Sequence, residues 1–515
     1  MLFKLSRVLH KYSGLIFFFY FLLMAISGVL LNHPKLIHKI SVPLQLTPAS
    51  HMLMNGNRMA VREALVDGDN IYLAGRAGVW WSNDNGLNFF KIDAGFPSAS
   101  YDQDTFSLSL DKKHNRLFAG TRSGLYVYSF ATEQWQNILF GATDNEPVVE
   151  LLQIKNRLLL FTQQHCYSSG LETQKPFFRI EPLSFDTKSR PQSARLLHFF
   201  LKVHDGSILG LGGRLFVDAI GLALIFLCAT GLVIWLLPRY KKKSTRLISS
   251  KFKFQWFYSN HLKIGAYTFT FISIIVLSGM VIRPPFIKTV AAYNIPLWTL
   301  PMEHGSNWKP RIDKAAFEPE TETLWIATRQ GFFCGHPEFT QPLQKQPVPV
   351  PRSGMGTSVF ESLPGQQLLI GSFSGLYIWD PLNHQPTSLL HYKGENPTGS
   401  RYKVTAAVIK NGNPIHVADY HRGLVPLAAK NRLQLPPQIT MTAMSLWHFL
   451  FEFHNGRIFQ QWLGTHTWIL IPIGGVLLLS NLVTGFYDWL WHNRKVIFKK
   501  KQTEKKLPQS GIKGR

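Results

Sequence analysis

Four long hydrophobic segments stand out from the mixed pattern of apolar and polar residues along the chain. They cover residues 13–32, 216–237, 265–282 and 468–491. Each can cross the roughly 30 Å hydrocarbon core of a bilayer, which takes about 20 helical residues. The pattern therefore predicts four transmembrane helices. For the first segment, its 20-residue length and the following Asn32-His33-Pro34 favour a retained anchor over a cleaved signal peptide.

The two long segments between these helices, 33–215 and 283–467, predict β-structure. Short aromatic and β-branched runs alternate with Gly, Asn and Asp, and motifs such as FAGTRSGLYVY (118–128) recur. Within each segment the motif glycines lie 44 to 48 residues apart, at Gly78 and Gly124 and then at Gly331, Gly375 and Gly423. This period is typical of a four-stranded propeller blade. Three blades per segment predict a six-bladed β-propeller, and a pair of antiparallel β-sandwiches is the alternative. We favour one propeller because an isolated three-blade half would leave open sheet edges.

The hydrophobic segments and their flanks also repeat, which indicates an internal duplication. Four pairs of motifs match in order: His10…Gly14 with His261…Gly265, Ser27-Gly28 with Ser278-Gly279, LHFFLKVHDG (197–206) with WHFLFEFHNG (447–456), and Thr230-Gly231 with Thr484-Gly485. Each half consists of a span, a long segment and a second span. We therefore expect the halves of the four-helix bundle to be related by an axis along the membrane normal.

The distribution of positive charge along the chain predicts its orientation in the membrane. Lys and Arg number 55 against 30 Asp and Glu, a net charge of +25, which would suit a nucleic-acid-binding protein. However, segments 1–12, 238–260 and 492–515 carry +18 of this charge, and each adjoins a predicted span. Positive residues are retained on the cytoplasmic side. We therefore predict cytoplasmic termini, a cytoplasmic basic loop and a β domain on the far side of the membrane, with the lipid bilayer and no nucleic acid as partner. A bacterial inner-membrane location, with the β domain in the periplasm, is what the family resemblance described below implies.

Paired histidines are the strongest candidates for chemistry. His10 and His261 are equivalent by the repeat and lie at the cytoplasmic ends of the first and third spans. A glycine one turn after each histidine would leave a flat slot beside its ring. Two neutral imidazoles from facing helices are what a bis-histidine haem needs. The alternative is that the two histidines anchor helix ends at the membrane surface.

A second pair would lie on the periplasmic side. His204 and His454 are also equivalent by the repeat, and a continuous helix would carry them roughly 15 Å beyond the hydrocarbon core at 1.5 Å per residue. We favour them as ligands of an outer haem, while His33 and His466 are alternatives that lie nearer the apolar boundary but break the symmetry. One or two haem b groups are thus predicted. His198 and His448, six residues upstream of the favoured pair, are interpreted as supporting residues.

A few further polar residues could take part in chemistry. Asp218 and Asp488 fall within spans, where carboxylates usually face a bundle interior, pair with a base or line a proton path. Cys166 and Cys334 occupy similar positions in neighbouring predicted blades, so a disulfide between them is one hypothesis for an oxidising compartment.

The motifs around the spans resemble a known family. RVLHKYSGLIFFFYFLLMAISGVLLN, the HDG…TGLVIW segment and the HNG…TGFYDWLW segment are similar to the PepSY-associated transmembrane family, bacterial iron-regulated inner-membrane proteins that include dihaem siderophore reductases. The resemblance implies haem contacts for His10, His261, His204 and His454. It also implies electron transfer outward, from a quinol or a cytosolic reductase to a ferric chelate or siderophore in the periplasm. No PepSY module separates the spans, and propeller-like motifs occupy that space.

The leading functional hypothesis is accordingly a dihaem transmembrane ferric reductase, an oxidoreductase. The chain contains no GxGxxG fingerprint, P-loop or flavodoxin-like module, so this function would require a separate electron donor. The alternative is a non-enzymatic, membrane-anchored propeller that acts as a receptor or assembly scaffold.

Overall fold

The computed structural model describes residues 1–141, 146–173, 176–240, 247–301, 309–351, 353–390, 402–427 and 432–504. The chain forms two compact units, each assembled from segments far apart in the sequence. A helical unit contains Met1–Pro34, Gln192–Gly305 and Leu450–Arg515, and a β unit contains Lys35–Pro191 and Ser306–Phe449. Parts of two predicted basic segments, 241–246 and 505–515, lie outside the described residues.

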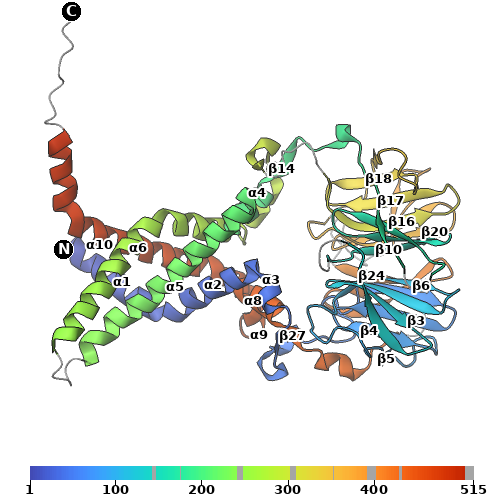
Figure 1. Cartoon of the computed structure of the whole chain (residues 1–515), viewed down its shortest axis with the longest axis horizontal. Helices are drawn as coiled ribbons and strands as arrows, with labels where there is room; N and C mark the ends of the chain where they lie inside the picture. The colour runs from blue at the N-terminus through green and yellow to red at the C-terminus, as the bar shows by residue number, and fades with distance from the viewer. Residues whose placement is uncertain are drawn as a thin grey trace, which may run out of the picture. The chain divides into compact units, whose positions relative to one another are not determined.

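Long helices dominate the helical unit (Figure 1). Its main helices are α1 (Leu2–Ile16), α2 (Phe18–Asn32), α4 (Leu196–His204), α5 (Gly210–Tyr240), α6 (Leu247–Val281), α7 (Ile287–Ala292), α9 (Gln460–Leu463) and α10 (Leu470–Glu504). Two short helices, α3 (Pro34–Ile37) and α8 (Leu446–His454), lie at the boundaries between the units, and strands β14 (Ser193–Arg195) and β15 (Asn294–Pro296) pair within the helical unit. Helix α6 packs against α5 and α10, α2 packs against α5, and α1 packs against α10.

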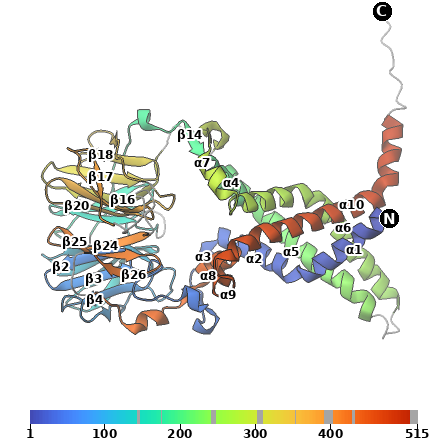
Figure 2. The same cartoon turned by 180° about the vertical axis from the view of Figure 1, so that it is seen from behind.

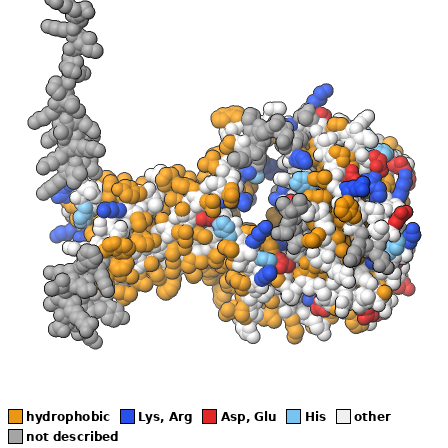
Figure 3. Space-filling model, in the orientation of Figure 1, with side chains coloured by type: hydrophobic (Ala, Val, Ile, Leu, Met, Phe, Trp, Pro, Cys, Tyr) orange, Lys and Arg blue, Asp and Glu red, His pale blue; other side chains and the backbone are white. Residues whose placement is uncertain are grey.

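Three helical segments of the described chain are long and apolar enough to cross a membrane: Ser207–Leu237, Phe254–Val281 and Arg457–Arg494. Helices α1 and α2 pass the same test only as a pair, because a bend of 64° separates them. Hydrophobic side chains cover much of the visible face of this unit, as expected for helices surrounded by lipid (Figure 3). The protein is therefore a membrane protein.

Contacts within α1 and from α10 accompany the bend between α1 and α2. The Ser13 hydroxyl donates to the Leu9 carbonyl (2.6 Å), a contact that bends helices, and Gly14 follows it. The side-chain amide of Asn481 on α10 also donates to the His10 carbonyl (3.0 Å) and to the Ser13 hydroxyl (2.9 Å). A side chain thus inserts into the hydrogen-bond ladder of α1 one turn before the bend.

The helices that carry His204 and His454 do not continue into the membrane helices. Helix α4 ends at His204, and Gly206 turns the chain with a φ of +77° before α5 begins. Helix α8 ends at His454, and Gly456 turns the chain with a φ of +75°. Both glycines occupy the left-handed region that terminates helices. The extension of the spans beyond the core, considered from the sequence, is thus replaced by separate short helices.

The β unit consists of many small antiparallel sheets. Five have four strands and one has three: β2 (Glu63–Asp67), β3 (Asn70–Gly75), β4 (Gly78–Ser82), β5 (Phe90–Lys91); β6 (Thr105–Asp111), β7 (Arg116–Thr121), β8 (Gly124–Ser129), β9 (Gln134–Ile138); β10 (Glu150–Ile154), β11 (Arg157–Phe161), β12 (Cys166–Gly170), β13 (Arg179–Ile180); β16 (Ile312–Glu318), β17 (Thr323–Thr328), β18 (Gly331–Gly335), β19 (Gln344–Gln346); β20 (Thr357–Leu363), β21 (Gln367–Ser372), β22 (Gly375–Trp379), β23 (Pro386–Ser388); and β24 (Val404–Lys410), β25 (Asn413–Asp419), β26 (Gly423–Pro426). A further pair joins β1 (Ser41–Val42) to β27 (Met444–Ser445).

The first strands of successive sheets contact one another, and β24 of the last sheet contacts β2 of the first (Figure 2). Apolar clusters fill the spaces between neighbouring sheets, for example the cluster of Leu73, Trp80, Ala406 and Val408. The motif glycines predicted from the sequence begin the third strands and have positive φ values, such as +124° at Gly124. The prediction of an all-β domain is confirmed.

The three cysteines are free thiols. The disulfide considered between Cys166 and Cys334 is therefore not formed in this structure. Cys166 is buried in the cluster between β11, β12 and the β16–β18 sheet, whereas the Cys334 thiol accepts a hydrogen bond from Gln346 (3.2 Å).

Candidate cofactor site formed by paired histidines

The structure brings His10 and His261 together within the helical unit. The ring of His10, on α1, lies 6.1 Å from the ring of His261, on α6, measured between ring centres. The Nδ1 atom of His10 is 2.9 Å from the Asn481 carbonyl oxygen and 3.3 Å from the Thr484 hydroxyl of α10. The Nδ1 atom of His261 is 2.9 Å from the Thr230 hydroxyl of α5. Each ring is thus held by a helix other than its own.

His204 and His454 form a second pair of the same kind. Their ring centres lie 5.9 Å apart, although α4 and α8 are separate short helices. The Nδ1 atom of His204 is 2.9 Å from the Ile275 carbonyl oxygen and 3.4 Å from the Ser278 hydroxyl of α6. The Nδ1 atom of His454 is 2.9 Å from the Ser27 hydroxyl of α2.

These contacts determine which ring nitrogen carries the proton. Each of the four hydroxyl groups donates its one hydrogen to a backbone carbonyl of its own helix, at 2.7 to 3.1 Å. The hydroxyl and carbonyl oxygens can then only accept from the histidine. Nδ1 is therefore protonated in all four neutral rings, and Nε2 keeps its lone pair. This is the tautomer in which a histidine ligates a metal through Nε2.

A glycine follows each of the four hydroxyl residues and lies against the histidine ring. A Cβ atom at Gly485 would come within 2.8 Å of His10 Cε1, and one at Gly279 within 2.7 Å of His204 Cε1. The spacing is wider at Gly231, 3.5 Å from His261 Cε1, and at Gly28, 3.5 Å from His454 Cε1. The missing side chains give the rings their space beside the helix backbone. The sequence predicted instead that the glycine one turn after the histidine forms the slot, but Gly14 lies against Asn481.

The two halves of the duplication hold each other's histidines. His10 belongs to the first half and packs on Thr484-Gly485 of the second, whereas His261 of the second half packs on Thr230-Gly231 of the first. On α6, His261 and Gly279 are 18 residues apart, which corresponds to roughly 27 Å along the helix. The two histidine pairs are therefore separated by a distance close to the thickness of a hydrocarbon core, about 30 Å.

Each pair offers two nitrogen ligands and no more. Among the described residues, no group of three or more His, Cys, Asp or Glu is arranged to hold a metal ion. Two imidazoles that bind one metal from opposite sides, at nitrogen–metal distances of about 2.0–2.1 Å, have ring centres roughly 6 Å apart. Both pairs have this spacing. The donor set therefore suits a metal whose remaining ligands come from a macrocycle, as in haem.

Charged groups surround the His204–His454 pair. Arg457 forms two hydrogen bonds with Glu452, both 2.8 Å, and Arg283 lies close enough to both histidines to affect their charge. Burial and the charge of Arg457 lower the pKa of Arg283 to about 10. The Nδ2 group of Asn455 is buried without a hydrogen-bond acceptor among the described residues. The positive charge of Arg283 near both histidines and the unused donor of Asn455 would suit a carboxylate of a bound group.

The alternative outer ligands lie in different surroundings. His33 Nε2 is 2.7 Å from Asp218 Oδ2, and the Asn32 amide donates to the other oxygen of the same carboxylate (2.9 Å). His466 is exposed in the short helical segment before α10.

The second carboxylate at membrane depth, Asp488, lies 3.4 Å from His492 Nδ1. His448 belongs to the β unit, where its Nδ1 is 2.8 Å from the Ser445 hydroxyl.

The supporting residues of the two pairs were not recognised as such from the sequence. Ser27, Ser278, Thr230 and Thr484 appeared there only as markers of the duplication. Their common signal is a hydroxyl residue followed by glycine in an apolar span, at equivalent positions of both halves. Asn481 gave no comparable signal because its counterpart in the first half is Leu227.

Comparison with known proteins identifies the class and then the family. The paired histidines and apolar helices define a membrane protein with a candidate cofactor site, joined to a β-rich domain. The sequence pattern of the family described as PepSY-associated TM region matches residues 7–491. The chain therefore belongs to this family. No curated protein matches the chain significantly.

Several solved structures resemble the chain at low identity. The extracellular domain described as that of a hybrid two component system from B. thetaiotaomicron is 10% identical, with a TM-score of 0.37, over 75% of this chain and 39% of that one. The WD40 β-propeller domain of Doa1 is 8% identical, with a TM-score of 0.35, over 72% of this chain and 93% of that one. The chain thus spans about two fifths of the length of the first of these structures.

Proposed function

We propose that this protein is a haem-containing electron-transfer protein of the bacterial inner membrane that reduces a ferric chelate in the periplasm. The observation that supports this most directly is the arrangement of His10 with His261 and of His204 with His454, with Nε2 as the free nitrogen of every ring. When bound at both pairs, haem b supplies single-electron exchange near each face of the membrane.

The topology belongs to the same proposal. Helices α1 and α2 together would form one bent span. With α5, α6 and α10 as the other three spans, it would complete a four-helix bundle. The excess of Lys and Arg at both termini and between the second and third spans supports a cytoplasmic location for these segments. The six sheets of the β unit would then form a six-bladed propeller in the periplasm.

The chain's own residues would orient and tune the ligands. Hydrogen bonds from Nδ1 to backbone carbonyls fix the rings and raise the basicity of Nε2. The apolar helices around each pair keep water away from the histidines. Arg283 provides a positive charge beside the His204–His454 pair, where a carboxylate of the bound group can be neutralised.

The reaction requires an electron donor and an acceptor. A quinol or a cytosolic reductase would donate, and the Fe(III) of a siderophore-type chelate would accept one electron and become Fe(II). Ligands with hard, charged oxygens hold Fe(II) less tightly than Fe(III), so the reduction would release the iron.

The test is the absorption spectrum of the purified full-length protein in detergent, followed by its reaction with ferric citrate. We expect the Soret and α bands of six-coordinate b-type haem, and a return of the oxidised spectrum when the anaerobically reduced protein is mixed with the chelate. A protein without these bands would contradict the proposal and favour a cofactor-free receptor or scaffold.

A further inference from the structure

A second candidate site lies within the β unit, at the end of the sheets where first strands begin and second strands turn into third strands. In an antiparallel sheet these two positions lie at the same end. Arginines occur at both: Arg62 and Arg311 precede the first strands β2 and β16, and Arg76, Arg122 and Arg329 lie in the hairpins between second and third strands. The closed succession of sheets therefore brings arginines from different sheets together.

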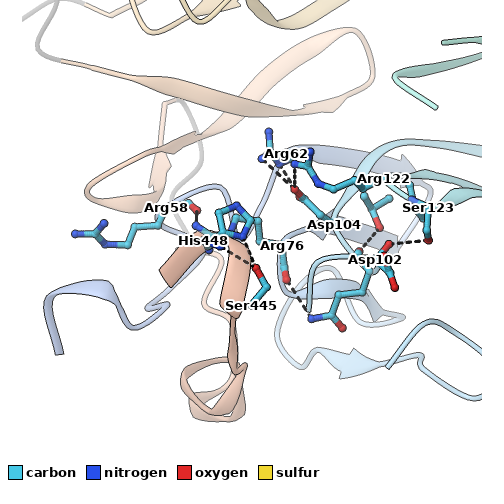
Figure 4. Close-up of polar contacts among 12 residues, drawn as sticks. Arg58, Arg62, Arg76, Asp102, Asp104, Arg122, Ser123, Ser445 and His448 are labelled. Atoms are coloured by element: carbon cyan, nitrogen blue, oxygen red, sulfur yellow. Dashed lines mark hydrogen bonds and ion pairs between the residues drawn. The ribbon is translucent and has the colours of Figure 1, made fainter. Parts of the chain in front are cut away.

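Asp104 is the centre of one part of this cluster. Arg62 contacts its carboxylate through Nε (2.8 Å) and Nη2 (3.2 Å), and Arg122 contacts it through Nη2 (2.5 Å). Arg76 lies close by, and its Nη1 donates to the Arg58 carbonyl (3.3 Å). Figure 4 shows Arg62 and Arg122 meeting at Asp104, with Arg76 beside His448.

Asp313 is the centre of the second part. Its carboxylate lies 2.8 Å from Arg329 Nε, and Arg311 is also near. The two parts adjoin, because the charge of Arg122 affects Arg311. Five guanidinium groups therefore lie near the two carboxylates of Asp104 and Asp313, while the carboxylate of Asp102 is bonded to His38 at 2.9 Å.

The excess of positive charge lowers the pKa values of neighbouring basic groups. Burial, and then the charges of Arg76, Arg122 and Arg62, lower the pKa of His448 well below its usual value. Burial and the charges of Arg329 and Arg122 lower the pKa of Arg311. In addition, Arg122 Nε is a buried donor without an acceptor among the described residues. Positive groups that repel one another and a buried N–H without a partner are what an anion would relieve.

The buried glutamates of the first strands do not neutralise the positive charge of the arginine cluster. Glu63 and Glu150 already lie 2.7 Å and 3.1 Å from Lys314 Nζ. Burial raises the pKa of Glu150 and raises that of Glu361 well above its usual value, which favours their neutral forms. The deeper group therefore carries little net charge at neutral pH.

A small pocket gives access to part of the cluster. It is lined by Arg76 together with His51, Ser100 and Ser445. The Arg76 guanidinium and the hydroxyl groups of this wall can donate hydrogen bonds to an oxyanion. Guanidinium groups bind carboxylates in a two-point, planar geometry, as Arg62 already does with Asp104.

We propose that the arginine cluster of the β unit binds a small anion that carries several carboxylates. If the proposed ferric reductase function holds, on which this identification of the ligand rests, the anion is the ferric chelate itself. The five arginines then select chelates with negative charge over neutral or cationic ones.

The test is binding of citrate and of ferric citrate to the full-length protein in detergent, measured by calorimetry at low and high salt. Arg311 reaches solvent and makes neither of the ion pairs with Asp104, so Arg311→Gln leaves that part of the fold intact. We expect Arg311→Gln and Arg76→Gln each to weaken binding about tenfold and Arg311→Lys to weaken it less. Lys113→Gln removes the same charge in the exposed turn between β6 and β7 and serves as the matched control.

The outcomes separate this site from the haem proposal. Binding that persists in His10→Ala and His204→Ala supports an anion site that is independent of haem. Absence of citrate binding in the wild type, equal binding by the arginine variants and Lys113→Gln, or binding only to vesicles of anionic lipid would overturn the inference. Thermal unfolding of Arg311→Gln and Arg311→Lys verifies that both variants are folded.

Discussion

At the scale of single residues, four histidines owe their orientation to a hydroxyl residue and a glycine on a neighbouring helix. The hydroxyl and a backbone carbonyl fix the proton on Nδ1, and the glycine makes room for the ring. The sequence predicted the pairing of these histidines because the members of each pair occupy equivalent positions in the two repeated halves. It did not predict their supports, because these residues come from the opposite half of the chain.

The glycines provide a matched test of this geometry. In Gly485→Ala, the new Cβ would lie 2.8 Å from His10 Cε1, so the ring must shift, whereas in Gly231→Ala the distance to His261 Cε1 is an ordinary 3.5 Å. We expect Gly485→Ala to lose roughly half of the bound haem and Gly231→Ala to keep nearly all of it. Haem quantification per chain in the two variants measures this. Equal haem content in both would show that the glycine at position 485 does not position the ring.

At the scale of helices and strands, the periodic patterns were informative and the turns were not. The apolar segments predicted helices, and the glycine motifs predicted the small sheets. The bend between α1 and α2 escaped prediction because it depends on Asn481, which is distant in sequence. The arginine cluster escaped for a similar reason, since its members lie in loops of different sheets that meet only when the ring closes.

The turn after α4 can be tested against its counterpart after α8. Alanine at Gly206 or Gly456 would adopt a positive φ, which costs about 1–2 kcal/mol in either case. At Gly206 the Cβ would overlap with backbone, 2.3 Å from the Gly213 carbonyl oxygen, whereas at Gly456 the nearest atom, the Thr467 carbonyl oxygen, is 3.3 Å away. We expect Gly206→Ala to lower the thermal unfolding midpoint clearly more than Gly456→Ala does. A similar decrease in both variants would contradict the role assigned to the close approach.

The first strands of the β unit hold a buried charge group with a pH-dependent contribution. Burial raises the pKa of Glu150 and Glu361 in the folded protein, and Lys314 opposes this rise. The folded state therefore binds more protons than the unfolded one, and stability decreases as the pH rises from the unfolded value of 4.5 through the folded values. Lys314→Met removes the cation that opposes this rise, so the pKa values of both glutamates rise further.

We expect Lys314→Met to destabilise the β unit by about 3–5 kcal/mol at pH 8 and by less at pH 5. Urea unfolding of the full chain at the two pH values, followed by tryptophan fluorescence, measures the difference. Lys112→Met is the control, because Lys112 forms an exposed ion pair with Asp67. A loss that is the same at both pH values would show that the glutamates do not titrate in this range.

At the scale of the whole molecule, the chain combines membrane helices with a β domain. The helical segments are duplicated, and a long β segment interrupts each copy. Each half contributes to both units, because each long β segment is inserted between two spans. The net charge of +25 is concentrated next to the spans, so it predicts an orientation in the membrane and not a nucleic-acid partner. The family is that of the PepSY-associated TM region, although the inserted segments form a β domain of small sheets.

The central claim is that two histidine pairs each hold one haem. Its most direct test is the haem content per chain of the wild type and of His10→Ala, His261→Ala, His204→Ala and His454→Ala, measured with absorption spectra of the purified proteins. We predict two haems in the wild type and the loss of one in each variant, with the same spectral component missing in the two members of a pair. A haem-free wild type, or four variants with unchanged haem content, would contradict the account.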